Sequence, residues 1–188
     1  MLSKSYALSF VSAGVLMARD AFRRDAEINF RYSAMVDGVR VPINPANGDL
    51  DEARIAGRVR GGHVDVDGFD APLQTFADLA RVHHFTPLVT YVPSTYTAYA
   101  GSVVFEDAEV GRDAAELSRV QRLRLAATTA RLDLPFLDLT PAFQAAAASG
   151  PLTHFPANLH LTARGHQVVA TAIAAKLAGM NSRAAGSR

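Results

Sequence analysis

"TPLVTYVPS", residues 86–94, is a short apolar and β-branched run that ends near a proline, and this is the pattern of a buried strand. "PFLDLTP" (residues 135–141) has the same character, and the sequence between the two runs predicts a long helix over residues 111–134. A strand, a helix and a second strand in this order predict a right-handed crossover between parallel strands. We therefore expect an α/β fold with a parallel sheet and flanking helices.

Two predicted helices present apolar stripes toward this sheet. The stripe of the long helix comprises Leu117, Val120, Leu123 and Ala127. A second helix precedes the first strand, with Asp70 at its N-cap and Pro72 in its first turn. The stripe of this second helix comprises Leu73, Phe76, Leu79 and Val82. Apolar residues at such spacings share one side of a helix, so we expect both stripes to be buried.

Residues 28–43 alternate between apolar and polar side chains on both sides of an Asp37-Gly38 pair. Alternation around Asp-Gly is typical of a β-hairpin, and we expect one over about residues 28–44. "NPANGD" (44–49) then predicts a turn, with Asp49 capping a short helix over residues 50–59. The Gly- and Asp-rich segments do not match an EF-hand calcium loop, and turn formation explains them better.

The N-terminal stretch "YALSFVSAGVLMA" (residues 6–18) is apolar and follows Lys4. Its spacing predicts an amphipathic helix with a stripe made of Leu8, Val11, Val15, Ala18 and Phe22. A short signal-peptide core is the alternative, although the charged residues that follow offer no small-residue cleavage site. The run is shorter than the ~20 residues of a spanning helix, so we expect no membrane span.

The composition narrows the class of protein. At 188 residues, with 49% hydrophobic and 20% charged side chains, the chain fits one globular domain, which we expect over residues 1–179 before a disordered tail over 180–188. A net charge of +1 argues against a nucleic-acid partner, which requires a basic surface. The absence of cysteine excludes disulfides, thiolate nucleophiles and cysteine-based zinc sites. Neither cytoplasm nor periplasm is favoured by these features.

"FPANLHLTARGH" (residues 155–166) leads into the last predicted helix, which opens at Thr162 and stops at Gly179. His160 lies two residues before the Thr162 N-cap, in a loop that we expect at the carboxyl ends of the parallel strands, where α/β sheets collect their chemistry. Histidine is the commonest general base, so His160 is a candidate catalytic base. The alternative is a loop histidine that is solvated or hydrogen-bonded locally.

Ser94, Tyr91 and Tyr96 belong to "YVPSTY", at the end of the first predicted strand. Polar groups at this edge are candidate substrate-binding residues, with a capped loop and aromatic packing as the alternative. His154, His160 and His166 recur at intervals of six, which is not the i, i+4 spacing of helical metal ligands. We therefore expect no metal site, and no cofactor is implied.

Three stretches together resemble the C-terminal half of an SGNH/GDSL-type hydrolase: "TYVPS", "LPFLDLTPAFQAAAASG" and "HFPANLHLTARGHQVVATAIAAKL". The resemblance covers roughly residues 70–178, and the hairpin segment looks like an insertion ahead of it. It implies a flavodoxin-like three-layer α/β fold. It also implies carboxylic-ester hydrolysis or O-acyl transfer on a small-molecule or carbohydrate acyl ester.

On the motif of that family, His160 takes the position of the histidine base and Asn158 the position of the aspartate. Thr162, Gly165 and His166 take the positions at the helix entry. In the chemistry that the resemblance implies, a serine attacks the ester carbonyl and the histidine removes the serine proton. A carboxylate then orients the ring and stabilises the imidazolium.

Two features depart from the family pattern. Asn158 brings no charge to an imidazolium, although Asp138 is an acid that could take over this role. No Gly-Asp-Ser nucleophile turn occurs, and "NGDLD" has Leu50 where the serine would stand.

Three hypotheses follow from these departures. The first is an incomplete SGNH-type esterase, weakly active alone, that self-associates or recruits a partner chain to complete its sheet. The second is a working esterase with a non-standard serine, Ser12 or Ser94. The third is a non-catalytic binding or scaffold domain that uses a cleft near Tyr91, Ser94 and Tyr96.

Overall fold

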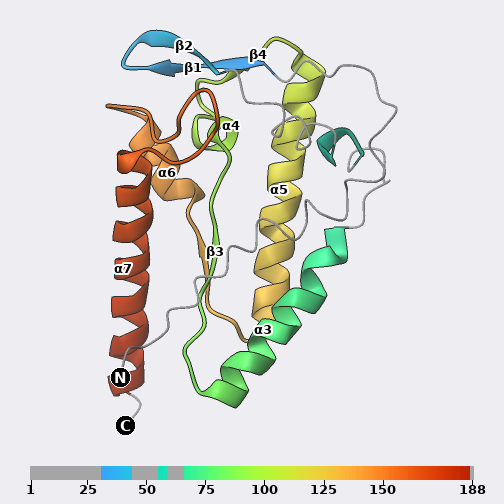
Figure 1. The fold of residues 1–188 in the computed structure, drawn as a ribbon, viewed down its shortest axis with the longest axis vertical. Coiled ribbons are helices and arrows are strands. Elements are labelled where there is room, and N and C mark those ends of the chain that lie inside the picture. Colours follow the sequence, from blue (N-terminus) through green and yellow to red (C-terminus); the bar gives the residue numbers. More distant parts are fainter. Residues whose placement is uncertain (1–30, 44–54, 59–65, 187–188) are drawn as a thin grey trace.

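The computed structural model describes residues 31–43, 55–58 and 66–186 (Figure 1). The predictions for the N-terminal helix, for Ser12 and for the Asp49 cap lie outside these residues. Residues 55–58 are helical, in agreement with the later part of the helix expected over residues 50–59.

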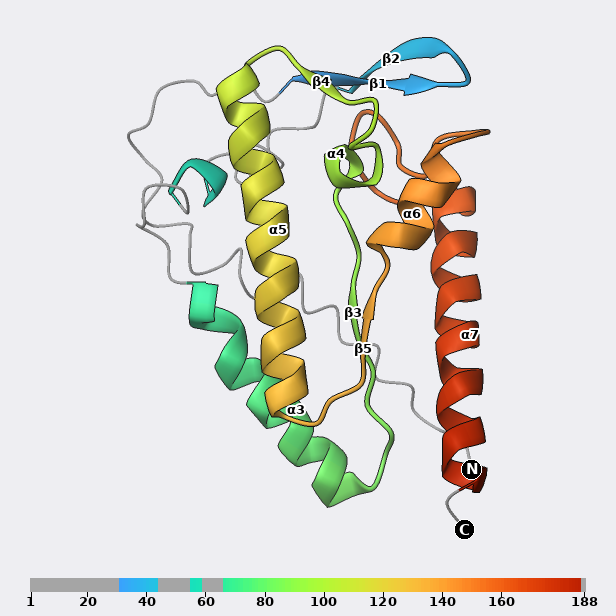
Figure 2. The ribbon, with the colours of Figure 1, turned by 180° about the vertical axis from the view of Figure 1, so that it is seen from behind.

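A parallel pair of strands lies at the centre of the described fold. β3 (Val89–Tyr91) pairs with β5 (Phe136–Asp138), and α5 (Ala108–Arg131) connects them. Together with α3 (Asp70–His83), α5 lies on one side of the pair, while α7 (Ala163–Gly186) lies on the other (Figures 1 and 2). The predicted mixed α/β fold and its parallel pairing are confirmed.

A second, antiparallel sheet crosses one end of the molecule (Figure 1). β1 (Tyr32–Val36) and β2 (Val39–Ile43) form the predicted hairpin, and its Asp37-Gly38 turn has φ values of 48° and 79°. Positive φ at both residues is the geometry of a type I′ turn, which glycine adopts without strain. β4 (Val104–Phe105) joins the other edge of β1. So short a strand leaves no periodic signal, and the sequence did not predict it.

α4 (Thr95–Ala98) and α6 (Thr140–Ala147) follow β3 and β5, so each begins near a carboxyl end of the parallel pair. A short 3-10 turn, η2 (Val66–Phe69), leads into α3. Within the described residues, buried apolar side chains form three clusters. A central cluster contains Ala34, Ala98, Tyr99, Leu139 and Phe143. A hairpin cluster contains Tyr32, Ile43, Tyr96 and Ala114, and an α3 cluster contains Leu73, Ala77 and Leu134.

The apolar stripes predicted for α5 and α3 are only partly buried. On α5, Leu117 is 2% exposed but Leu123 is 57% exposed; on α3, Leu73 is buried but Val82 is 69% exposed. Both predicted stripes advance mainly three residues at a time, and such a series drifts about 60° around the helix at each step. The buried residues combine steps of three and four and stay on one side. They include Leu73, Ala77 and Ala80 on α3, and Ala114, Leu117 and Ser118 on α5.

Three helices have boundaries that differ from the prediction. α5 extends over Ala108–Arg131, whereas the sequence predicted residues 111–134. The N-cap of α3 is Phe69, and Asp70 instead accepts hydrogen bonds from Thr128, Arg124 and Arg131. The hydrogen bond from Thr128 and the two nearby guanidinium groups hold the pKa of Asp70 below its usual range, against a smaller effect of burial. At the other end of the chain, α7 continues past Gly179 to Gly186, so residues 180–186 are helical and not an unstructured tail.

Leu117→Ala and Leu123→Ala distinguish the two sides of α5. Removing the buried Leu117 side chain leaves a cavity and should lower the free energy of unfolding by about 2–5 kcal/mol. Removing the exposed Leu123 side chain should change it by roughly 0.5 kcal/mol or less. Denaturant unfolding followed by circular dichroism measures both values. Equal losses in the two variants would contradict this assignment of the buried side.

Candidate functional site

The candidate base lies in the loop between α6 and α7, residues 153–162, and the main chain of this loop closes on itself. An isolated antiparallel bridge joins its two arms. The Phe155 N–H donates to the His160 carbonyl oxygen at 2.8 Å, and the Thr162 N–H donates to the Thr153 carbonyl oxygen at 3.0 Å. These bonds fix the backbone of His160 relative to the start of α7.

His160 itself is exposed. Its backbone N–H donates to Oδ1 of Asn158 at 3.1 Å. Between these two residues, Leu159 adopts a positive φ of 56° and packs against the hairpin cluster, which anchors the loop. The side chain of Asn158 thus holds the main chain of His160, whereas the sequence predicted that Asn158 would orient the imidazole ring.

His154 is the buried histidine of this loop, and the sequence pattern assigned it no role. It is 2% exposed, its Nδ1 lies 3.0 Å from Oγ1 of Thr153, and its ring lies 5.3 Å from that of Phe143, centroid to centroid. Burial lowers the pKa of His154 to about 4, and a hydrogen bond to the backbone of Pro93 only partly opposes this shift. His154 is therefore neutral at pH 7 and ties the loop to the end of β3.

The first turn of α7 fits tightly against the same loop. Oγ1 of Thr162 donates to the Leu152 carbonyl oxygen at 2.7 Å and accepts from the Gly165 N–H at 3.3 Å, so Thr162 is the N-cap, as predicted. A Cβ on Gly165 would lie 2.2 Å from the Thr153 carbonyl oxygen, a contact that only glycine avoids. The Thr153 N–H in turn donates to the buried Tyr99 hydroxyl at 3.0 Å.

Arg164 fastens the start of α7 to the end of α6. Its guanidinium donates to the carbonyl oxygens of Ala146, Ser149 and Pro151. Carbonyl groups at a helix end have no partner within the helix, and a cation there satisfies them. His166, the other motif residue on this turn, is exposed.

Tyr91 is the last residue of β3, and Ser94 and Tyr96 lie at the N-cap and in the first turn of α4. α4 runs beside this loop in both views (Figures 1 and 2). Ser94 is half-buried at the N-cap of α4 and directly follows Pro93, the residue bonded to His154. Tyr91 is 8% exposed and Tyr96 is 3% exposed. Both tyrosines are buried, in agreement with the alternative of aromatic packing, and their role in substrate binding stays a prediction. Of the three residues, Ser94 has the largest exposed fraction.

A buried group of hydroxyls was not predicted from the sequence. Oγ of Ser118 lies 2.9 Å from the Tyr91 hydroxyl and also contacts Oγ1 of Thr97. One feature of the sequence could have indicated this buried group. Ser118 lies one helical turn after Ala114, on the buried side of α5. These hydroxyls join β3 and α4 to α5 and keep the carboxyl end of β3 in place.

Asp138, the acid considered as a replacement for Asn158, has other partners. Its Oδ2 accepts from Nε of Arg122 at 2.7 Å, and its Oδ1 accepts from the Thr140 N–H at 2.8 Å. Burial alone would raise the pKa of Asp138, but the hydrogen bonds from Thr140 and Arg122 outweigh it and hold the pKa below its usual range. Asp138 therefore accepts from the first N–H of α6 and forms an ion pair with Arg122 of α5.

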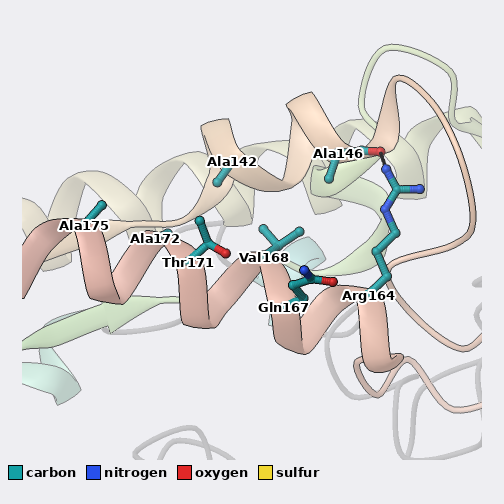
Figure 3. A pocket seen from close by; sticks show the side chains of 8 residues that line it. All are labelled: Ala142, Ala146, Arg164, Gln167, Val168, Thr171, Ala172 and Ala175. Atoms are coloured by element: carbon teal, nitrogen blue, oxygen red, sulfur yellow. Dashed lines mark hydrogen bonds between the residues drawn. The ribbon is translucent and has the colours of Figure 1, made fainter.

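Two surface grooves lie away from His160. The larger, of about 410 Å³, runs between α6 and α7; four of its eight lining residues are alanines, and Arg164 lies at one end (Figure 3). The smaller, of about 190 Å³, lies between α5 and β5 around Leu123 and Phe136. Neither groove is lined by His160, Asn158 or Ser94.

Within the described residues, no group of three or more His, Asp and Glu side chains is placed to hold a metal ion. No helix in that part of the chain has the length and apolar character needed to cross a membrane.

Comparison with known proteins finds no match to a family model, a curated protein or a solved structure. The SGNH/GDSL resemblance rests on the sequence motifs and stays a prediction.

Gly165→Ala and Gly179→Ala test the tight fit of α7. The Cβ of the first variant would collide with the Thr153 main chain, so the free energy of unfolding should fall by about 1–3 kcal/mol. Gly179 lies on the same helix with nothing within 4 Å of its added Cβ. There, alanine should stabilise by roughly 0.5–1 kcal/mol, because it is the better helix former. Thermal and denaturant unfolding measure both effects; a tolerated alanine at position 165 would contradict the close approach.

Proposed function

We propose that this chain carries the base side of a serine-type acyl-ester site, with His160 as general base. The chemistry would be hydrolysis of a carboxylic ester or transfer of its acyl group, on a small-molecule or carbohydrate substrate. The observation that supports this proposal most is that two contacts hold the loop of residues 153–162 in place. His154 ties it to Pro93, and Leu159 ties it to the cluster that contains Tyr96. Ser94 lies between those two attachment points in the sequence.

The proposed fold is the three-layer α/β fold of SGNH/GDSL-type hydrolases. The order β3, α5 and β5, with α7 on the opposite side of the strand pair, agrees with that proposal. Parts of the motifs that carry the resemblance directly follow the two parallel strands: "VPS" follows β3, and "LTP" leads from β5 into α6. In parallel sheets, chemistry gathers at this edge, which supports the same location for the site.

In the proposed mechanism, His160 removes the hydroxyl proton of the attacking serine and later returns a proton to the leaving alcohol. Ser94 is the candidate nucleophile in the described part of the chain. Asn158 holds the His160 main chain and supplies no negative charge, and Asp138 is engaged by Arg122. Without a carboxylate to stabilise the imidazolium, the reaction should be slow, since replacing the triad aspartate of a serine protease by asparagine lowers kcat by ~10⁴.

A non-catalytic binding or scaffold domain is the second candidate. The observation that favours it is that the motif residues have packing roles of their own. Thr162 caps α7, Gly165 permits its close approach and Arg164 holds the end of α6. These roles would be kept in a domain that has no catalytic activity.

A fluorophosphonate probe separates the two candidates, because it captures a serine activated by a neighbouring base. We expect one slow adduct per chain by intact mass, mapped to Ser94 and lost in both Ser94→Ala and His160→Ala. His166→Ala is the matched control, since His166 is also exposed but lies on the first turn of α7. It should leave labelling unchanged. No adduct on the folded protein, or an adduct that survives His160→Ala, would reject the esterase proposal.

A further inference from the structure

Phe155 is a large apolar side chain of the loop of residues 153–162 that the apolar clusters do not use. It is 49% exposed, and within the described residues it belongs to none of the three clusters. Two leucines of the same loop differ, because Leu159 packs against the hairpin cluster and Leu161 against the central cluster. A single exposed apolar residue is ordinary on a protein surface, so its significance depends on what lies beside it.

The residue opposite Phe155 in the loop is His160. The Phe155 N–H donates to the His160 carbonyl oxygen at 2.8 Å, and the next pair along the two arms is the antiparallel bridge between His154 and Leu161. Directly opposed residues of an antiparallel pair project from the same face, with Cβ atoms about 5 Å apart, and successive pairs alternate between the two faces. The side chains of Phe155 and His160 therefore share one face of the loop.

The burial of the four side chains agrees with this alternation. His154 is 2% exposed with its ring beside that of Phe143, and Leu161 packs against the cluster that contains Phe143, so this pair points inward. Phe155 and His160 are both exposed, so their pair points outward. The loop thus presents an apolar ring beside the imidazole of the candidate base.

We infer that Phe155 contacts the alcohol portion of the ester substrate and that this alcohol is apolar. The inference rests on the proposed function, in which His160 removes the serine proton and returns it to the leaving oxygen as the bond from that oxygen to the acyl carbon breaks. Water then releases the acyl group as the acid. A base that protonates the leaving oxygen lies next to the alcohol, so a side chain beside the base meets the alcohol first. Phe155 has no hydrogen-bonding group in its side chain, and it can contribute only by removing apolar surface from water.

A set of matched esters tests this inference on the full chain. Hexyl acetate and ethyl hexanoate have the same composition, and each is longer than ethyl acetate, the first on the alcohol side and the second on the acyl side. In the wild-type chain, kcat/KM for hexyl acetate should exceed that for ethyl acetate about tenfold, because the added methylenes leave water on the Phe155 ring. Phe155→Ala should lower this ratio to roughly two or less, whereas Phe155→Leu, which keeps an apolar side chain, should retain most of it. The ratio of ethyl hexanoate to ethyl acetate should be the same in all three proteins.

Phe85→Ala is the matched control. Phe85 is similarly exposed, at 42%, but it precedes β3 and so lies at the opposite end of that strand from Ser94. Its replacement should leave both ester ratios unchanged. A general loss of structure lowers the rates for all esters together, so the ratios report contact with the substrate, and circular dichroism checks that each variant folds.

The possible results separate this inference from the proposed function. A hexyl acetate preference that survives Phe155→Ala, or a loss that appears for ethyl hexanoate instead, would overturn the inference and leave the esterase proposal standing. No hydrolysis of any of these esters, together with no fluorophosphonate adduct, would reject the esterase proposal and this inference with it.

Discussion

The first turn of α7 approaches the Thr153 main chain so closely that a Cβ on Gly165 would stand 2.2 Å from the Thr153 carbonyl oxygen. The arrangement of the candidate site depends on this contact. It sets the position of the N-cap Thr162, whose side chain bonds both to Leu152 and to the Gly165 N–H. It also holds Thr153 where its N–H reaches the Tyr99 hydroxyl. A displaced helix would therefore move both arms of the loop that presents His160.

Burial of His154 extends this constraint from α7 to the strand pair. The neutral ring lies between Thr153 and the backbone of Pro93, so the loop and the end of β3 are held together in the interior. A buried hydrogen-bonded side chain of this kind is costly to disrupt, because its polar atoms would lose their partners. The residues of the "FPANLHLTARGH" motif thus have two separate roles. Thr162, Gly165 and Arg164 satisfy the packing of α7, whereas His160 and Asn158 are exposed and accessible for chemistry.

The sequence predicted the features that depend on local pattern. The Asp37-Gly38 hairpin, the two strands joined by α5 and the Thr162 cap are all present, because turn chemistry and periodicity specify them locally. The sequence did not correctly predict features that depend on contacts between residues far apart in the chain. Leu123 and Val82 are exposed because packing selected another side of each helix, and Asp70 bonds to α5 and does not cap α3. The burial of His154 and Tyr91 likewise depends on tertiary contacts that no single-sequence spacing reveals.

The most direct test of this account is an NMR titration of the His154 ring. If burial between Pro93 and Thr153 holds the ring neutral, it should titrate near pH 4, below the ordinary value of 6.5. Between these two pH values the unfolded chain binds a proton that the folded chain does not, so acidification should lower the free energy of unfolding by about 3 kcal/mol in total, with the loss complete below pH 4 and absent above 6.5. A ring that titrates near 6.5 in the folded protein would show that His154 is not buried, and the coupling between β3 and the His160 loop would be rejected.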